Sequence, residues 1–144
     1  SRGTVNASVE GPLASPVIQT NFLSHSDDVK TLRDGVKILR TVFSDSAFDA
    51  LRGLEKSPGP EISGDDQLDE WVRETAETIF HPVGTCKMGV GEDAVVDPEL
   101  RVRGINRLRV ADASIMPTIV GGNTNAGSIM IGEKASDLIG TATK

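Results

Sequence analysis

The sequence has little aromatic character, a single cysteine and a deficit of positive charge. Aromatic residues make up 3% of the 144 residues and tyrosine is absent, which predicts a core of leucine, isoleucine and valine. Because Cys86 is the only cysteine, the chain can hold no internal disulfide and fits a reducing compartment. The net charge of −6 argues against a nucleic-acid partner, which requires a basic surface.

Two further patterns are missing. No window approaches the run of about 18 apolar residues that a membrane span requires, and the first residues lack a basic region followed by an apolar core. No G-x-G-x-x-G motif occurs, although this pattern forms the turn that holds the pyrophosphate of a dinucleotide. The chain begins at Ser1 without an initiator methionine, so we expect it to be part of a longer protein.

Short strands and an amphipathic helix are predicted for the first third of the chain. β-branched residues interrupted by glycine and proline favour strands at 5–9 and 17–22. Apolar residues then recur at three-to-four spacing over 27–42, which predicts a helix with Ser26 as its N-cap. Gly35 lies inside this helix and costs it about 1 kcal/mol relative to alanine.

Two more helices are expected before residue 80. A short helix over 48–54 ends at the loop 57–60, which is rich in proline and glycine. Ser63 and Asp66 stand three residues apart, as in a capping box, and predict the start of the next helix. Trp71 is expected to pack in the core from this helix. The predicted apolar face consists of Leu68, Trp71, Val72, Thr75 and Ile79.

The last third of the chain changes to an alternating pattern. Apolar residues at 100, 102, 108 and 110 alternate with arginines, which predicts a hairpin or two adjacent strands with solvated arginines. Residues 126–139 are apolar nearly all round in their first two turns, which predicts a buried helix. Strands followed by helices favour an α+β fold, with an antiparallel or mixed sheet and helices packed on one face.

His81 opens the first of two polar clusters, the segment 81–89. Pro82 biases the histidine backbone toward extended conformations, and Gly84 and Gly89 imply an irregular path that positions a side chain. A fixed imidazole can take a proton from a substrate hydroxyl near neutral pH, although a purely structural histidine is the alternative. The nearby Cys86 has no basic partner in the sequence and is interpreted as a buried, inert thiol.

The second polar cluster, 121–125, comes directly before the predicted buried helix. Asn or Thr side chains here can accept the free N–H groups of the first helical turn, while Gly121 and Gly122 let a ligand approach the backbone. A helix N-terminus also favours negative charge. The pattern therefore predicts either a ligand site or a simple helix cap.

With the segment between them, the two clusters resemble the C-terminal region of the glucose–methanol–choline (GMC) family of FAD-dependent oxidoreductases. The resemblance is strong over 81–139 and looser over 1–43. It departs at Gly127, where many members have proline, and this change is expected to loosen the first helical turn. The matching motifs are His81-Pro82-x-Gly84-Thr85-x-x-Met88-Gly89, Val96-Asp97-Pro98, Leu100-Arg101-Val102, the Asp112 segment, Asn123-x-Asn125 and Ile131-Gly132-Glu133-Lys134.

The resemblance implies a catalytic pair. His81 matches the family's active-site base, and Asn123 matches its partner, which is asparagine in choline-oxidising members and histidine in glucose-oxidising ones. In this interpretation His81 accepts the alcohol proton while the α-carbon delivers hydride to flavin, and Asn123 holds the alkoxide oxygen.

The resemblance also implies cofactor contacts. Asp112 and Ala113 match a segment that touches FAD, and Thr124 and Asn125 match residues beside the flavin ring. Most of the FAD site is expected in an N-terminal domain outside these residues, so this chain alone should bind FAD weakly or not at all. We expect 1–110 to be part of a substrate-binding domain and 111–144 to pack on the FAD-binding domain, exposing apolar surface and favouring self-association when that domain is absent.

The implied activity is the oxidation of a primary alcohol, choline or another, to the aldehyde, with oxygen or a quinone-type compound as the electron acceptor. Two alternatives stay open: a hydroxynitrile lyase of the same fold, which binds FAD without net redox chemistry, and a non-catalytic binding module. No metal is implied. The expected location is the cytoplasm, or the periphery of the inner membrane for the full-length enzyme.

Overall fold

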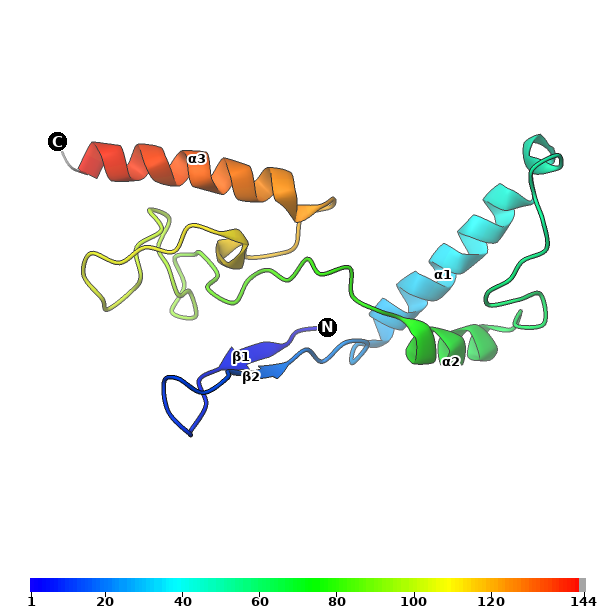
Figure 1. Ribbon diagram of the computed structural model, residues 1–144, viewed down its shortest axis with the longest axis horizontal. Coiled ribbons are helices and arrows are strands. Elements are labelled where there is room, and N and C mark those ends of the chain that lie inside the picture. Colours follow the sequence, from blue (N-terminus) through cyan, green and yellow to red (C-terminus); the bar gives the residue numbers. More distant parts are fainter. Residues whose placement is uncertain (143–144) are drawn as a thin grey trace. The chain divides into compact units, whose positions relative to one another are not determined.

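The chain forms two compact units, which divide it between Glu77 and Thr78. The computed structural model describes residues 1–142, and the order of their elements is shown in Figure 1. The two short strands and three α-helices found in residues 1–142 confirm the predicted α+β class. None of the helices within residues 1–142 is both long and apolar enough to cross a membrane. The predicted domain division at 110/111 concerns packing on a further domain and stays a prediction.

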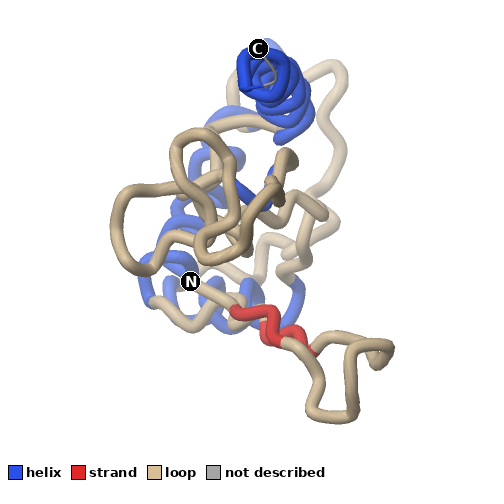
Figure 2. Tube along the Cα trace, turned by 90° about the vertical axis from the view of Figure 1, so that its left-hand side faces the viewer, coloured by secondary structure: helices blue, strands red, loops and turns tan. Residues whose placement is uncertain are grey.

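The sheet of the first unit is a single short hairpin (Figure 2). Strand β1 (Thr4–Asn6) pairs with strand β2 (Val17–Gln19) in antiparallel register, with Thr4 opposite Gln19. Both strands lie where the sequence predicts them but are shorter. All their residues are exposed, and the helices pack chiefly on each other and on a short 3-10 turn. The expected layer of helices on one face of a sheet is therefore not the main packing of residues 1–142.

Helices α1 (Ser26–Phe43) and α2 (Asp65–Thr75) pack against each other in the first unit. Val29 of α1 and Leu68 and Val72 of α2 are buried, and Nη1 of Arg33 donates to Oδ2 of Asp69 at 2.9 Å. The helix positions are confirmed, whereas Ile79, expected on the apolar face, is exposed beyond the end of α2.

The two predicted N-caps are wrong by one residue. His25 caps α1, because its Nδ1 accepts the N–H of Asp27 at 3.2 Å, so Ser26 is already helical. Gly64 caps α2, and Oε1 of Gln67 accepts the Gly64 N–H at 3.1 Å. Glycine has no side chain to accept a hydrogen bond from the first helical turn. The side-chain hydrogen bond of this cap is therefore the one that Gln67 accepts from the Gly64 N–H.

The segment between α1 and α2 is mostly irregular. The predicted helix over 48–54 is wrong: a 3-10 turn, η1 (Ser46–Phe48), takes its place, capped by the Asp45 carboxylate, which accepts the N–H of Ala47 at 2.8 Å. Leu51 and Leu54 are 84% and 94% exposed, so neither leucine is part of a buried helical face.

The second unit is built around a core of loop segments and one long helix, α3 (Thr124–Ala142). The predicted hairpin exists only as isolated bridges, Val96 with Val102 and Arg101 with Arg109. Leu100 and Arg107 have φ of 66° and 63°, and such left-handed residues interrupt regular strands. The buried core residues are Val96, Leu100, Ile115, Met116, Ile131 and Ala135.

Helix α3 is buried on one face only. Ile131 and Ala135 are 5% and 4% exposed, while Ile129 and Met130 are each 60% exposed. The predicted buried helix is thus buried along the face of Ile131 and Ala135, while Ile129 and Met130 are exposed. The expectation that this helix exposes apolar surface here is confirmed.

Candidate active site

The segment that carries His81 is fixed by backbone hydrogen bonds to the residues just before α3. Cys86 N–H donates to the Ser114 carbonyl at 2.9 Å, and Met88 N–H donates to the Ile115 carbonyl at 2.8 Å. Gly84 has φ of 86°, and a Cβ there would lie 3.2 Å from the Met116 carbonyl oxygen, so the close approach requires glycine. The segment is thus an anchored loop, and Cys86 within it is half-buried.

The residues before α3 form a second 3-10 turn, η2 (Ala113–Ile115), capped by Asp112. Oδ1 of Asp112 accepts the N–H of Ser114 at 2.8 Å. Hydrogen bonds from the Ser114 side chain and N–H hold the pKa of the Asp112 carboxyl below its ordinary value, because they favour the charged form. Ala113 is half-buried in the same turn. The carboxylate is therefore already engaged within the chain.

His81 contacts the first residue of α3. Its Nδ1 lies 2.8 Å from Oγ1 of Thr124, a hydrogen bond between residues 43 apart in the sequence. The histidine is half-buried, and Thr124 is 9% exposed. The structure thus unites the two polar clusters that the sequence singles out, and it does so through a hydroxyl group.

The structure does not join His81 to the predicted partner. Asn123 is exposed, and within residues 1–142 the hydrogen bond of His81 goes to Thr124. Asn125 is also exposed, in the first turn of α3. A Cβ added at Gly121 or Gly122 would meet no atom within 4 Å, so the space beside these two glycines is open. Asn123 and Asn125 are thus accessible to a ligand.

Sequence reasoning missed the partnership of Thr124 with His81. It placed both residues at the site, but the spacing of the two clusters does not say which of three adjacent polar residues faces the imidazole. A weak signal was available, because a β-branched hydroxyl residue in the first turn of a buried helix has few rotamers and a fixed direction.

The arrangement can move a proton. A half-buried imidazole with one ring nitrogen hydrogen-bonded leaves the other ring nitrogen for a substrate, and histidine exchanges protons near neutral pH. No cluster of three or more histidine, cysteine or acidic side chains able to hold a metal occurs among residues 1–142. The structure thus places a half-buried imidazole beside the N-terminus of α3.

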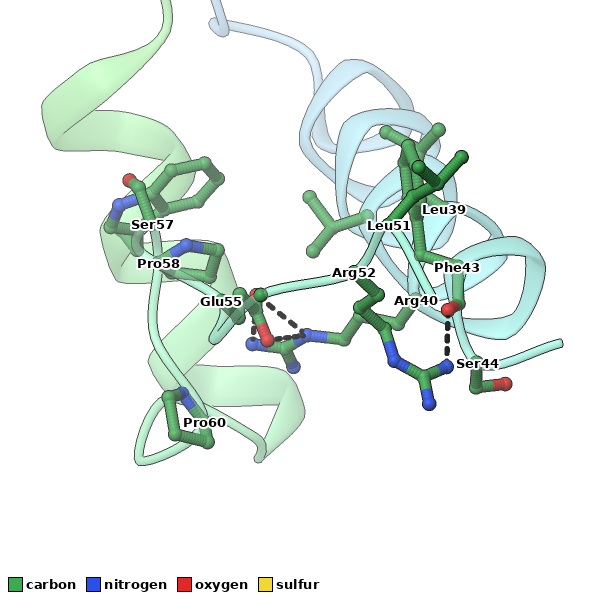
Figure 3. Close-up of a pocket in the computed structure, with 13 residues that line it drawn as sticks. Leu39, Arg40, Phe43, Ser44, Leu51, Arg52, Glu55, Ser57, Pro58 and Pro60 are labelled. Atoms are coloured by element: carbon green, nitrogen blue, oxygen red, sulfur yellow. Dashed lines mark hydrogen bonds and ion pairs between the residues drawn. The ribbon is translucent and has the colours of Figure 1, made fainter. Parts of the chain in front are cut away.

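A separate hollow of about 890 Å³ lies in the first unit (Figure 3). Its walls come from α1, the following loop and α2, where Trp71 is half-buried and lines the hollow. Arg40 pairs with Glu55 at 2.9 Å, and Arg52 pairs with Asp49 at 2.6 Å. Since its charged residues are already paired within the chain, this hollow is a weaker candidate for a polar substrate than the His81 site.

Known proteins resemble the chain over nearly its whole length. The sequence profile of the GMC oxidoreductase family matches residues 1–132. An oxygen-dependent choline dehydrogenase from Brucella ovis is 51% identical over 141 residues, which cover 96% of this chain and 26% of that protein. An oxygen-dependent choline dehydrogenase from Escherichia coli is 53% identical over 139 residues, covering 96% of this chain and 25% of that protein.

Solved structures share the fold. A formate oxidase from Aspergillus oryzae superposes with a TM-score of 0.89 at 31% identity, covering 97% of this chain and 25% of that chain. A fungal aryl-alcohol oxidase superposes with a TM-score of 0.84 at 34% identity, covering 95% of this chain and 23% of that chain. The chain spans about a quarter of the length of these relatives. Its sequence and fold place the chain in the GMC oxidoreductase family.

Proposed function

We propose that the chain works as the C-terminal part of an FAD-dependent oxidoreductase that oxidises a primary alcohol, choline or a similar compound, to the aldehyde. The observation that carries this proposal is the half-buried imidazole of His81, held by Thr124 at the start of α3. The identity to oxygen-dependent choline dehydrogenases supports the substrate class. His81 is the proposed proton acceptor.

The residues at the start of α3 fit a flavin. Asn125 is exposed, Ala113 is half-buried, and the space around Gly121 and Gly122 is open to a neighbouring group. The positive end of the helix dipole favours a group that gains negative charge, by up to about 2 kcal/mol in a partly buried site. We therefore assign Asp112, Ala113, Thr124 and Asn125 to the rim of the cofactor site. FAD, when bound, supplies the hydride acceptor.

The residues of this chain handle the proton and the alkoxide. The free ring nitrogen of His81 accepts the proton of the alcohol hydroxyl, which makes the α-carbon a better hydride donor. The exposed Asn123 amide donates a hydrogen bond to the resulting alkoxide oxygen and holds it in place. The His81 imidazole and the Asn123 amide belong to the same end of α3, since His81 is hydrogen-bonded to Thr124, the residue after Asn123.

Because the chain spans only about a quarter of the length of its relatives, the proposed function needs further protein and small-molecule partners. An N-terminal FAD-binding domain in the same full-length chain supplies the rest of the cofactor site, and oxygen or a quinone-type compound accepts the electrons. The Brucella and Escherichia relatives are oxygen-dependent choline dehydrogenases, which favours oxygen as the acceptor. The proposed location is the cytoplasm, or the periphery of the inner membrane for the full-length enzyme.

The test is the reduction of the full-length flavoprotein by choline in the absence of oxygen. The loss of flavin absorbance measures the rate of this reduction. His81→Ala should slow flavin reduction about 10²- to 10⁴-fold, the usual size of general-base catalysis. His25→Asn is the control, because it alters the other histidine and keeps a side chain able to cap α1. A loss below about tenfold in His81→Ala would contradict the proposed base.

A further inference from the structure

In the hydrogen bond between His81 and Thr124, the choice of donor and acceptor determines which ring nitrogen of the neutral histidine carries the hydrogen. We infer that Thr124 is a positioning residue: its Oγ1 accepts a hydrogen bond from Nδ1–H of His81, which fixes the neutral tautomer with Nε2 free. The inference rests on the proposed function, because a free Nε2 matters only if His81 accepts a proton.

The hydrogen-bonding chemistry of the pair allows two arrangements. A neutral imidazole has one N–H, and a threonine hydroxyl both donates and accepts. If the hydroxyl donated to Nδ1, the ring hydrogen would be on Nε2, and Nε2 could then only donate to a substrate. If Nδ1–H donates to Oγ1, Nε2 keeps its lone pair and can accept a proton. Only the second arrangement serves a proton acceptor.

Both partners sit on anchored backbone, so the contact can hold the ring in one orientation. The Thr124 carbonyl accepts the hydroxyl of Ser128 at 2.9 Å, and the same helix is fixed to the core by Ile131. A threonine side chain has few rotamers because it is branched at Cβ. On the other side, the loop that carries His81 is hydrogen-bonded to the segment before α3. The 2.8 Å separation is therefore held from both ends.

The second histidine of the chain offers an internal contrast. Nδ1 of His25 accepts the N–H of Asp27 at 3.2 Å, so the neutral form of His25 must carry its hydrogen on Nε2. The two histidines are thus expected to adopt opposite tautomers. A method that assigns His25 correctly therefore validates its assignment of His81.

The direct test is neutron diffraction from deuterium-exchanged crystals of the full-length protein at about pH 8, where ordinary histidines are neutral. Deuterium is expected on Nδ1 of His81 and on Nε2 of His25. Deuterium on Nε2 of His81, alone or together with Nδ1, would overturn the inference. This readout requires no turnover and is independent of the reaction.

Kinetics of two matched variants provide the second test. Thr124→Val keeps the shape and removes the hydroxyl, while Thr124→Ser keeps the hydroxyl. With choline as substrate and FAD-loaded protein, Thr124→Val should lower the limiting rate constant of flavin reduction about 10- to 100-fold, the size of effect known for the orienting partners of metal-bound histidines, with KM little changed. Thr124→Ser should recover most of the rate.

The outcomes separate the inference from the proposed function. A wild-type rate in Thr124→Val, or a Thr124→Ser variant as slow as Thr124→Val, would overturn the positioning role. A wild-type rate in His81→Ala would instead overturn the proposed function, while the neutron map still decides the tautomer.

Discussion

At the residue scale, Asp112 illustrates how the site is held together by its own backbone. Its carboxylate caps the turn η2, and the carbonyls of that turn accept the N–H groups of the loop that carries His81. The shape of the His81 loop therefore depends on a single ionised cap two residues before Ser114.

The cap gives the second unit an acid-sensitive contribution to stability. The pKa of Asp112 lies below its ordinary value of 3.8, so the folded state binds this proton less tightly than the unfolded state. This contribution to stability is present at pH values above the ordinary pKa and is lost as the pH falls through the lowered pKa of the folded state.

Asp112→Asn keeps an oxygen acceptor but does not titrate. We expect its unfolding midpoint to decline less than that of wild type below about pH 4, measured by thermal melts at several pH values. Parallel acid profiles would contradict this assignment.

Most of the candidate site, but not its internal contacts, was predictable at this scale. Residue types revealed His81 and the polar cluster before α3, because an imidazole in a glycine-rich loop and a polar helix start are local signals. The pairing of His81 with Thr124 depends on how a loop and a helix 43 residues apart pack, and no local pattern encodes that distance.

At the scale of elements, two helical glycines have different surroundings. A Cβ at Gly35 in α1 would meet no atom within 4 Å, whereas a Cβ at Gly127 in α3 would lie 2.8 Å from Cε of Met116. The chain thus places a methionine methyl group against the first turn of α3 at Gly127. Met116 fills space that a larger residue at 127 would need.

The two glycines form a matched pair for substitution. Gly35→Ala should stabilise α1 by about 0.4–1 kcal/mol, since alanine restricts the unfolded chain and favours the helix. Gly127→Ala should gain less, because the flexible Met116 side chain must move. Hydrogen exchange of the amides in α1 and α3 measures both changes. An equal gain at the two positions would contradict the packing described for Met116.

The elements themselves were predictable to different degrees. The periodicity of apolar residues located α1, α2 and α3, because amphipathic helices show themselves in sequence. The helix starts at His25 and Gly64 were missed, since serine is the commoner cap and these two positions depend on local geometry. The bridges around Leu100 replaced predicted strands because positive φ values interrupt the ladder.

At the scale of the whole molecule, the exposed apolar residues stand out. Phe80 is 83% exposed, and Ile129 and Met130 are each 60% exposed. Large apolar side chains exposed to this degree are typical of surfaces that another domain or protein covers. The chain covers about a quarter of its relatives' length, and the packing of these side chains against the FAD-binding domain stays a prediction.

The 144-residue chain produced alone should therefore differ from the full-length protein in two respects. We expect it to purify without stoichiometric FAD, because it has no glycine-rich pyrophosphate turn. We also expect it to self-associate through its exposed apolar residues. Absorbance near 450 nm and light scattering measure the two properties, with full-length protein as the reference. A yellow, monomeric isolated chain would contradict both expectations.

The bond between His81 and Thr124 also has a consequence for biosynthesis. The 43 residues between the two positions take roughly two to nine seconds to translate at 5–20 residues per second. During that interval Val96 and Leu100 have left the peptidyl-transferase centre without Ile131 and Ala135, their partners from α3. The His81–Thr124 pair therefore cannot form before the start of α3 has been translated, and until then the core of the second unit lacks its α3 partners.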